Sequence, residues 1–168
     1  MSLKSFPENA ELEIQKLERI YTRHTSKGCF MPWDEWEQKI RSACCELLRI
    51  AQQVPYDQIT ITYAELGRRI DLFPLSDWFH LKIAWILYAC ADYAYDEGYP
   101  LITALVVNSE TGQPGKGFWG LRGIPAHLRK VTKIEDITPF RISGERDKFW
   151  VAELKQIDKW GKAIKRSA

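Results

Sequence analysis

The stretch ITITYAELGRRI, residues 59–70, changes from a strand pattern to a helix pattern within a few residues. Residues 59–61 form a run of β-branched side chains, which is typical of a strand. Thr62 and Glu65 then form a capping box: the threonine hydroxyl accepts a hydrogen bond from the Glu65 amide, and the Glu65 carboxylate accepts one from the Thr62 amide. We therefore expect a strand to end and a helix to begin at Thr62.

Apolar periodicity and turn residues predict the elements on either side of this switch. Helices are expected over about 10–23, 33–54, 63–70 and 77–97 and from 144 onwards, a helical turn near 125–130, and strands over 59–61, 101–108 and 117–121. In the helix over 77–97, we expect one apolar face of Trp78, Leu81, Trp85, Tyr88 and Ala89. The glycine-rich segment SETGQPGKG, residues 109–117, predicts a loop that joins the last two strands as an antiparallel hairpin.

The order helix, strand, helix, helix, strand, glycine-rich loop, strand is typical of a winged helix. The sequence therefore predicts an α+β fold, with a winged-helix-like helix-turn-helix, a β-hairpin wing, and N-terminal and C-terminal amphipathic helices. The 168 residues are expected to form a single domain. Within it, N-terminal helices occupy 10–54, the winged-helix core 59–121, and a basic C-terminal segment and helix 122–168.

Composition excludes several protein classes. The chain contains neither a signal-peptide pattern nor an apolar run long enough to span a membrane, so a cytoplasmic protein is expected. Its four cysteines form no C-x-x-C pair, and its three histidines share no ligand spacing. We therefore expect reduced thiols, no metal site and no cofactor.

The segment VPYDQITITYAELGRRI, residues 54–70, resembles the motif that opens the DNA-binding domain of the O6-alkylguanine-DNA alkyltransferases and alkyltransferase-like proteins. In that family, the tyrosine of this motif lies beside a DNA phosphate and helps to turn out the damaged nucleotide. The resemblance therefore implies the same position for Tyr63. However, the family's reactive Pro-Cys-His-Arg motif is absent, which excludes alkyl transfer. The following helix, SDWFHLKIAWILYACADYAYDE, is bulky and net acidic, so base flipping is not supported.

A second resemblance covers most of the chain. The segments ITYAEL, residues 61–66, and PLITALVVNSETGQPGKGFWG, residues 100–120, are followed by a tryptophan-containing terminal helix. Together they are similar to a group of uncharacterised bacterial proteins that share TYxEL, PLxxALVVN and TGxPGxGF. This resemblance implies no particular activity.

Charge is unevenly distributed along the chain. Residues 59–108 carry 3 basic and 6 acidic side chains, whereas residues 109–168 carry 13 and 7, a net charge of +6. A basic final third favours a non-enzymatic protein that binds DNA mainly through backbone contacts. The candidate nucleic-acid-binding residues are Tyr63, Arg68, Arg69, Lys82, Lys116, Arg122, Arg129, Lys130 and Lys133.

A protein-interaction module, such as an inhibitor, an immunity protein or an accessory subunit of a bacterial defence system, is the alternative. The chain contains seven tryptophans, and large aromatic side chains are favoured interface anchors. The candidate anchors are Trp78, Phe79, Trp85, Phe118 and Trp119. An acidic or aromatic face over residues 63–97 would favour this alternative, and a basic face would favour DNA.

No catalytic constellation emerges from the sequence. GQPGKG fails the phosphate-loop template, because position 110 is glutamate and a glycine follows Lys116. Glu153 and Lys155 are two positions apart on an expected helix and do not face each other. Asp77 and His80 have no accompanying nucleophile.

Overall fold

The computed structural model describes residues 15, 18–22, 31–129 and 144–167, which form a mostly helical fold with one small sheet. The α-helices are α2 (Trp33–Gln53), α3 (Tyr63–Arg69), α4 (Phe79–Glu97) and α5 (Glu145–Ser167), and residues 15 and 18–22 are also helical. The strands are β1 (Ile61–Thr62) and β2 (Val106–Val107). Short 3-10 helices occupy η1 (Tyr56–Gln58), η2 (Ile102–Leu105), η3 (Lys116–Gly120) and η4 (Ala126–Leu128).

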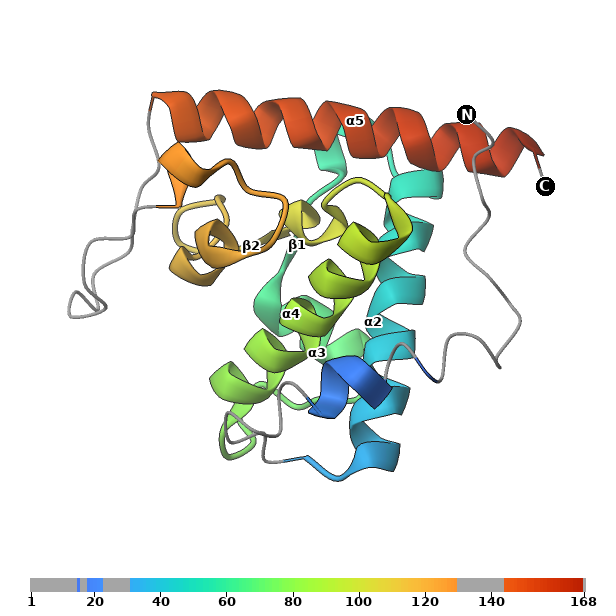
Figure 1. The fold of residues 1–168 in the computed structure, drawn as a ribbon, viewed down its shortest axis with the longest axis vertical. Coiled ribbons are helices and arrows are strands. Elements are labelled where there is room, and N and C mark those ends of the chain that lie inside the picture. Colours follow the sequence, from blue (N-terminus) through green and yellow to red (C-terminus); the bar gives the residue numbers. More distant parts are fainter. Residues whose placement is uncertain (1–14, 16–17, 23–30, 130–143, 168) are drawn as a thin grey trace.

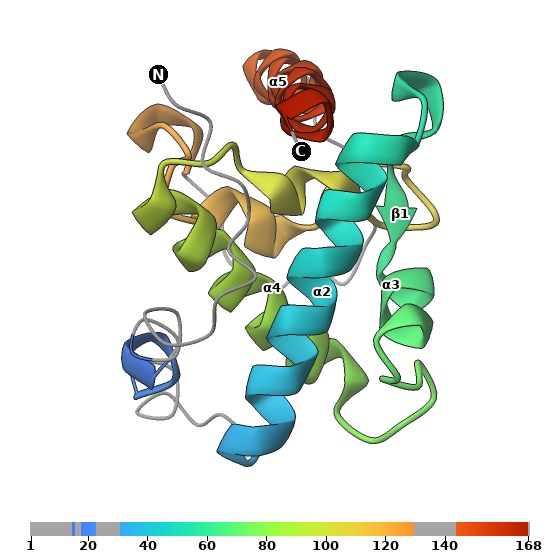
Figure 2. The same cartoon turned by 90° about the vertical axis from the view of Figure 1, so that its right-hand side faces the viewer.

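Three long helices frame the molecule. Helix α2 packs against both α4 and α5, and α5 lies crosswise over one end of the fold (Figure 1). Seen at right angles, α5 is viewed almost along its axis, with α2, β1 and α3 below it (Figure 2). The expected helices over 33–54 and from 144 onwards are confirmed.

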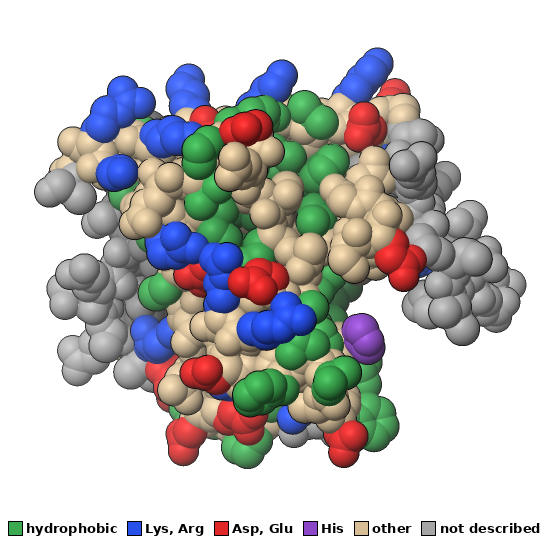
Figure 3. All heavy atoms as spheres, turned by 180° about the vertical axis from the view of Figure 1, so that it is seen from behind, with side chains coloured by type: hydrophobic (Ala, Val, Ile, Leu, Met, Phe, Trp, Pro, Cys, Tyr) green, Lys and Arg blue, Asp and Glu red, His purple; other side chains and the backbone are tan. Residues whose placement is uncertain are grey.

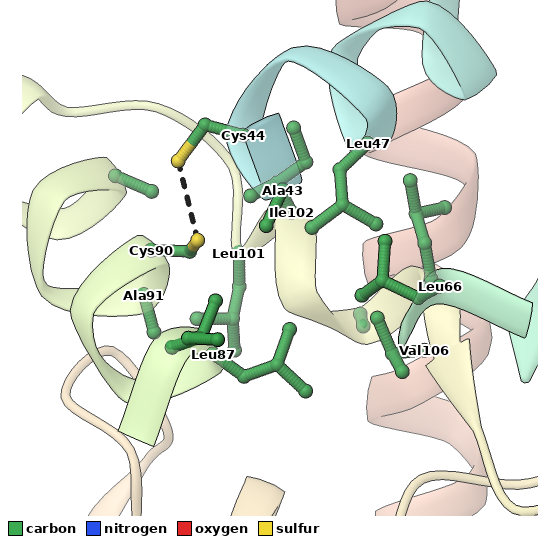
Figure 4. Close-up of a cluster of buried hydrophobic side chains, with 14 of the residues drawn as sticks. Ala43, Cys44, Leu47, Leu66, Leu87, Cys90, Ala91, Leu101, Ile102 and Val106 are labelled. Carbon is green, nitrogen blue, oxygen red and sulfur yellow. Dashed lines mark hydrogen bonds between the residues drawn. The ribbon is translucent and has the colours of Figure 1, made fainter. Parts of the chain in front are cut away.

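One cluster of buried side chains extends from Ile20 to Ile164, so the segments expected at either end of the chain share a core with the middle. Figure 4 shows part of it, where side chains of α2 and α4 meet η2 and β2. The buried thiols of Cys44 and Cys90 lie 3.2 Å apart between α2 and α4. The indole N–H of Trp150 donates to the carbonyl of Ala104 at 2.9 Å, which ties α5 to η2.

The expected antiparallel hairpin is wrong. Strand β2 pairs with β1 in parallel, with Ile61 opposite Val106 and Thr62 opposite Val107. Residues 102–105 form η2 rather than a strand, and residues 116–120 form η3 rather than the returning strand. Because the apolar run over 101–107 is buried on all sides, its sequence contains no alternation that could select a strand or its partner. The described residues therefore contain no hairpin wing.

Half of the capping box at the strand-to-helix switch is confirmed. Thr62 is the N-cap of α3, and its hydroxyl accepts a hydrogen bond from the Glu65 amide at 3.2 Å. The Glu65 carboxylate instead pairs with Arg68 at 3.2 Å and with Arg69 at 3.0 Å. Two cations one turn further along the helix compete with the neutral Thr62 amide for this carboxylate, and charge-assisted bonds are the stronger.

The apolar face expected for α4 is only partly confirmed, by Ala89, which is fully buried, and by Tyr88, which packs against the core. The helix buries Phe79, Ile83, Ile86 and Cys90, among others, whereas Leu81 is 41 % exposed and Trp78 is 62 % exposed. Apolar residues surround most of α4, so periodicity alone cannot select the buried side. The helix begins at Phe79, two residues later than expected.

Candidate functional site

A pocket of about 390 Å³ opens beyond the carboxyl ends of β1 and β2, which is where parallel sheets commonly bind ligands. Its walls come from α3, from α4 and from the segment after β2. The lining residues are Thr62, Tyr63, Ala64, Pro74, Phe79, His80, Ile83, Ala84, Leu87, Tyr88, Thr103, Asn108, Ser109, Gly115, Gly117, Phe118 and Leu121. Residues from both segments of the second resemblance therefore surround a single cavity.

Tyr63 connects the switch at Thr62 to the glycine-rich segment. Its phenol oxygen accepts a hydrogen bond from the Gly115 amide at 3.1 Å, and burial raises the pKa of this phenol. A Cβ at Gly115 would lie 2.9 Å from the phenol oxygen, so a larger residue there would displace the Tyr63 ring from this contact. Tyr63 therefore stays protonated at neutral pH, and its hydroxyl hydrogen remains able to donate.

Thr103 brings an unsatisfied polar group to the pocket wall. The residue is only 3 % exposed, and its hydroxyl oxygen has no hydrogen-bond partner among the described residues. Buried hydroxyls are normally paired, because water solvates them well and apolar surroundings do not. The oxygen exposes less than 1 Å² of surface, so it lies behind the pocket wall and not in the cavity itself.

The glycine-rich segment is a closed turn that folds toward the pocket. The Gln113 carbonyl accepts from the Asn108 amide, and the Asn108 carbonyl accepts from the Gly112 amide, both at 2.8 Å. The Asn108 side-chain oxygen accepts from the Glu110 amide at 2.8 Å, so the side-chain NH₂ of Asn108 remains to donate. The sequence predicted a wing tip that reaches toward nucleic acid, whereas the structure has this closed turn at the same place.

An exposed apolar patch lies beside the pocket, on the segment between α3 and α4 and on the first turn of α4. Phe73 is 75 % exposed and Leu75 is 99 % exposed, and they are joined by Trp78 and Leu81. Figure 3 shows hydrophobic side chains gathered at the end of the molecule opposite α5. Trp78 has a φ of +63°, a backbone conformation that bulky residues rarely adopt. We call these four residues the apolar patch.

Several cations that were expected to meet nucleic acid lie in ion pairs. Arg68 and Arg69 hold Glu65, and Arg69 also contacts Glu46 at 2.5 Å. The hydrogen bonds that Arg69 and Arg68 donate to the Glu65 carboxylate lower the pKa of Glu65. Arg122 pairs with two aspartates of α4, at 3.6 Å and 2.9 Å, and stacks over the Tyr95 ring.

The remaining candidates for nucleic-acid binding are dispersed. Tyr63 lies at the pocket, Lys82 is half-buried on α4, and Lys116 is half-buried at the start of η3. Arg129 is exposed, and its guanidinium donates to the Ile124 carbonyl at 2.6 Å. Lys130 and Lys133 lie outside the described residues.

The candidate protein anchors separate into two groups. Trp78 is exposed and Trp85 is half-buried, so both retain surface for a partner. Trp119 is fully buried, with its ring 5.0 Å from that of Phe118, and is therefore a core side chain. Phe118 and Phe79 are also buried, where they line the pocket.

Sequence reasoning missed Thr103, Asn108 and the exposed Phe73 and Leu75. The sequence around Thr103 is a continuous apolar run, in which a single threonine is an ordinary strand residue. A signal was available for the patch, since DLFPLSDW places Phe73, Leu75 and Trp78 in and beside a proline-containing turn. Because turns lie at the surface, large side chains in this turn could be expected to remain exposed.

A second surface lies on α5. Lys148, Lys155, Lys159 and Arg166 are exposed and follow one another at spacings of 7, 4 and 7 residues. These spacings place all four on one side of the helix, along about 27 Å of its axis. In Figure 3, Lys and Arg side chains project along the edge formed by α5. We call these four residues the α5 stripe.

The described residues offer no metal site, because nowhere do they bring together three or more His, Cys, Asp or Glu side chains suited to an ion. Within the same part of the chain, no helix is both long and apolar enough to cross a membrane. Comparisons of the chain with protein-family profiles, with curated proteins and with solved structures found no match.

Proposed function

We propose that this chain is a cytoplasmic protein-interaction module that binds a partner protein through the apolar patch. The observation that carries the proposal is the exposure of Phe73, Leu75 and Trp78 within six residues of sequence. Large apolar side chains gathered on a surface mark interaction sites, whereas single exposed ones are ordinary. Tryptophan is also among the residues most enriched at the energetic centre of protein interfaces.

Charge around the apolar patch indicates the chemistry of the partner. Asp71 and Asp77 are exposed and flank the patch along the chain. No lysine or arginine occurs between residues 70 and 81. The Lys39 ammonium also lies at this rim, because it donates to the carbonyls of Ile70 and Asp71 at 2.8 and 3.0 Å. A complementary partner therefore presents an apolar ridge with side chains of both charges at its rim, because complementary rims orient the encounter.

Substitutions in the apolar patch test the proposal without disturbing the core. Leu75→Ser and Trp78→Ser change exposed side chains, so the free energy of unfolding should shift by no more than about 0.5 kcal/mol. A partner that co-purifies from the source cell with the wild type should be lost from the double variant. Gln156→Ser, an exposed change on α5, serves as the matched control and should retain the partner.

Two results would contradict the proposal. The first is a partner that the double variant retains as well as the wild type does. The second is a mass, measured by light scattering at increasing concentration, that doubles for the wild type and not for the double variant. That second result would make the patch an interface between copies of this chain.

A second candidate function is binding to the nucleic-acid backbone, and the α5 stripe favours it. In the described part of the chain, Lys148, Lys155 and Lys159 make no ion pair, so their charges are available to phosphates. Phosphate contacts are blind to sequence and release counterions. Helix α4 is not proposed as a reading helix, because it buries most of its length and offers Lys82 as its single cation.

Duplex titration at low and physiological salt tests this second function. Each phosphate contact contributes about 0.9 to the slope of log affinity against log salt. Changing the three lysines to alanine should therefore flatten the slope by up to about 2.7, equally on unrelated sequences. Arg68→Ala serves as the control, because that arginine already pairs with Glu65. Absence of duplex binding at low salt would refute the function for this chain alone.

A further inference from the structure

The pocket beyond β1 and β2 carries an inference that goes beyond the proposed function. We propose that it binds an uncharged small molecule with a flat, mostly apolar body and one hydrogen-bonding group, which Tyr63 recognises. Its volume of about 390 Å³ falls within the range of small-molecule sites. The site is distinct from the apolar patch, which offers exposed side chains rather than a cavity.

The walls determine the body of the ligand. Four aromatic rings line the pocket, those of Tyr63, Phe79, Tyr88 and Phe118, and aliphatic side chains from α4 complete it. Aromatic rings favour stacked or edge-on contacts with other flat groups. A planar ligand would gain such contacts from both α4 and the segment after β2.

The absence of charge determines that the ligand is neutral. None of the residues that line the pocket is Lys, Arg, Asp or Glu. An anion or a cation would leave water without meeting an opposite charge, and that desolvation is not compensated. Phosphorylated molecules and amino acids therefore do not suit this site, whereas neutral amides, phenols and heteroaromatic rings do.

A buried phenol determines where the ligand must be polar. The Tyr63 oxygen already accepts from the Gly115 amide, so the hydrogen of its hydroxyl is left to donate to a ligand. A ligand group that accepts a hydrogen bond, such as an amide carbonyl, satisfies it. The exposed His80 and Ser109 lie at the rim, where a ligand would enter.

Three probes of nearly equal shape test the site: benzamide, benzoate and toluene. Binding to the full chain is measured by chemical-shift perturbation on titration. Benzamide should bind, and benzoate should bind at least tenfold more weakly because it is charged. Toluene should bind several-fold more weakly than benzamide, because it leaves the Tyr63 hydroxyl hydrogen unpaired.

Two variants assign the binding to this pocket. Tyr63→Phe keeps the ring and removes the hydroxyl, so toluene should still bind while the preference for benzamide over toluene disappears. Ala84→Phe fills the pocket and should abolish binding of both neutral probes. Its control is Ala152→Phe, the same change at an exposed position of α5, which should leave binding unchanged.

The outcomes separate this inference from the proposed function. No binding of benzamide at millimolar concentration, equal binding of benzoate, or binding that survives Ala84→Phe would each overturn it. Leu75→Ser with Trp78→Ser should leave benzamide binding intact. Retention of the partner protein by this double variant counts only against the apolar patch, and binding that survives Ala84→Phe counts only against the pocket, so either proposal can fail without the other.

Discussion

Gly161 lies where α5 crosses α2, and replacing it with alanine should destabilise the protein. A Cβ built at Gly161 would lie 2.5 Å from the carbonyl carbon and oxygen of Ala51, whereas ordinary contacts begin near 3.4 Å. Both residues are fully or nearly fully buried, and the atoms that it meets are backbone. The two helices must therefore separate by most of an ångström to admit a methyl group.

The magnitude follows from two opposing effects. In a solvated helix interior, glycine to alanine stabilises by about 1 kcal/mol, because alanine restricts the unfolded chain. Overpacking a close-packed contact costs about 1–3 kcal/mol or more when backbone has to move. At this crossing the second effect should prevail, so we expect a net loss of roughly 1–2 kcal/mol in the free energy of unfolding.

Urea denaturation monitored by far-ultraviolet circular dichroism measures this difference. The control is a pair of variants at exposed Gln156 on the same helix, Gln156→Gly and Gln156→Ala, of which the alanine form should be the more stable by about 1 kcal/mol. The sign of the effect should thus be opposite at the two positions. If Gly161→Ala stabilises the protein as the exposed pair does, the close approach of α2 and α5 is not present and the reasoning fails.

Three further predictions concern the switch, a buried carboxyl and the thiols. Thr62→Ala removes the hydroxyl that caps α3 and should cost about 1 kcal/mol in urea denaturation; an unchanged midpoint and slope would show that the cap contributes nothing. Burial raises the pKa of Glu153 in the folded state, so its charged form opposes folding once the pH rises above the unfolded pKa near 4.3. Glu153→Gln should therefore unfold at higher urea than the wild type at pH 7, and the two midpoints should converge below about pH 4. Among the three cysteines in the described part of the chain, Cys45 is exposed while Cys44 and Cys90 are buried, so peptide mapping after brief alkylation should find Cys45 modified before the other two, and equal labelling of all three would contradict the packing of α2 on α4.

The long helices and the switch at Thr62 could be predicted from local sequence. Helix α2 combines a regular apolar spacing with charged residues between the apolar positions. Any apolar surface can cover such a face, so the helix can be predicted without knowing the topology. The same holds for α5. The cap at Thr62 depends on residues three positions apart, which makes it independent of distant contacts.

The pairing of strands could not be predicted in this way. The hypothesis of a hairpin assumed that β2 finds its partner across the nearby glycine-rich loop, as sequential strands often do. Instead it pairs with β1, more than forty residues earlier, because α4 returns the chain to the same side. Two residues on each strand contribute only a few hydrogen bonds, so packing of α4 and η2 decides the register.

The sequence by itself therefore determined where the long helices form, that no cluster of catalytic residues is adjacent along the chain, and that the last third is basic. Only the tertiary structure decided which side of α4 is buried, that Tyr63 faces Gly115, and that Thr103 borders a cavity without a hydrogen-bond partner. The physical reason is the range of the interactions. Capping and helical periodicity act within one or two turns, whereas a pocket exists only where segments distant in the chain pack against one another and leave space between them.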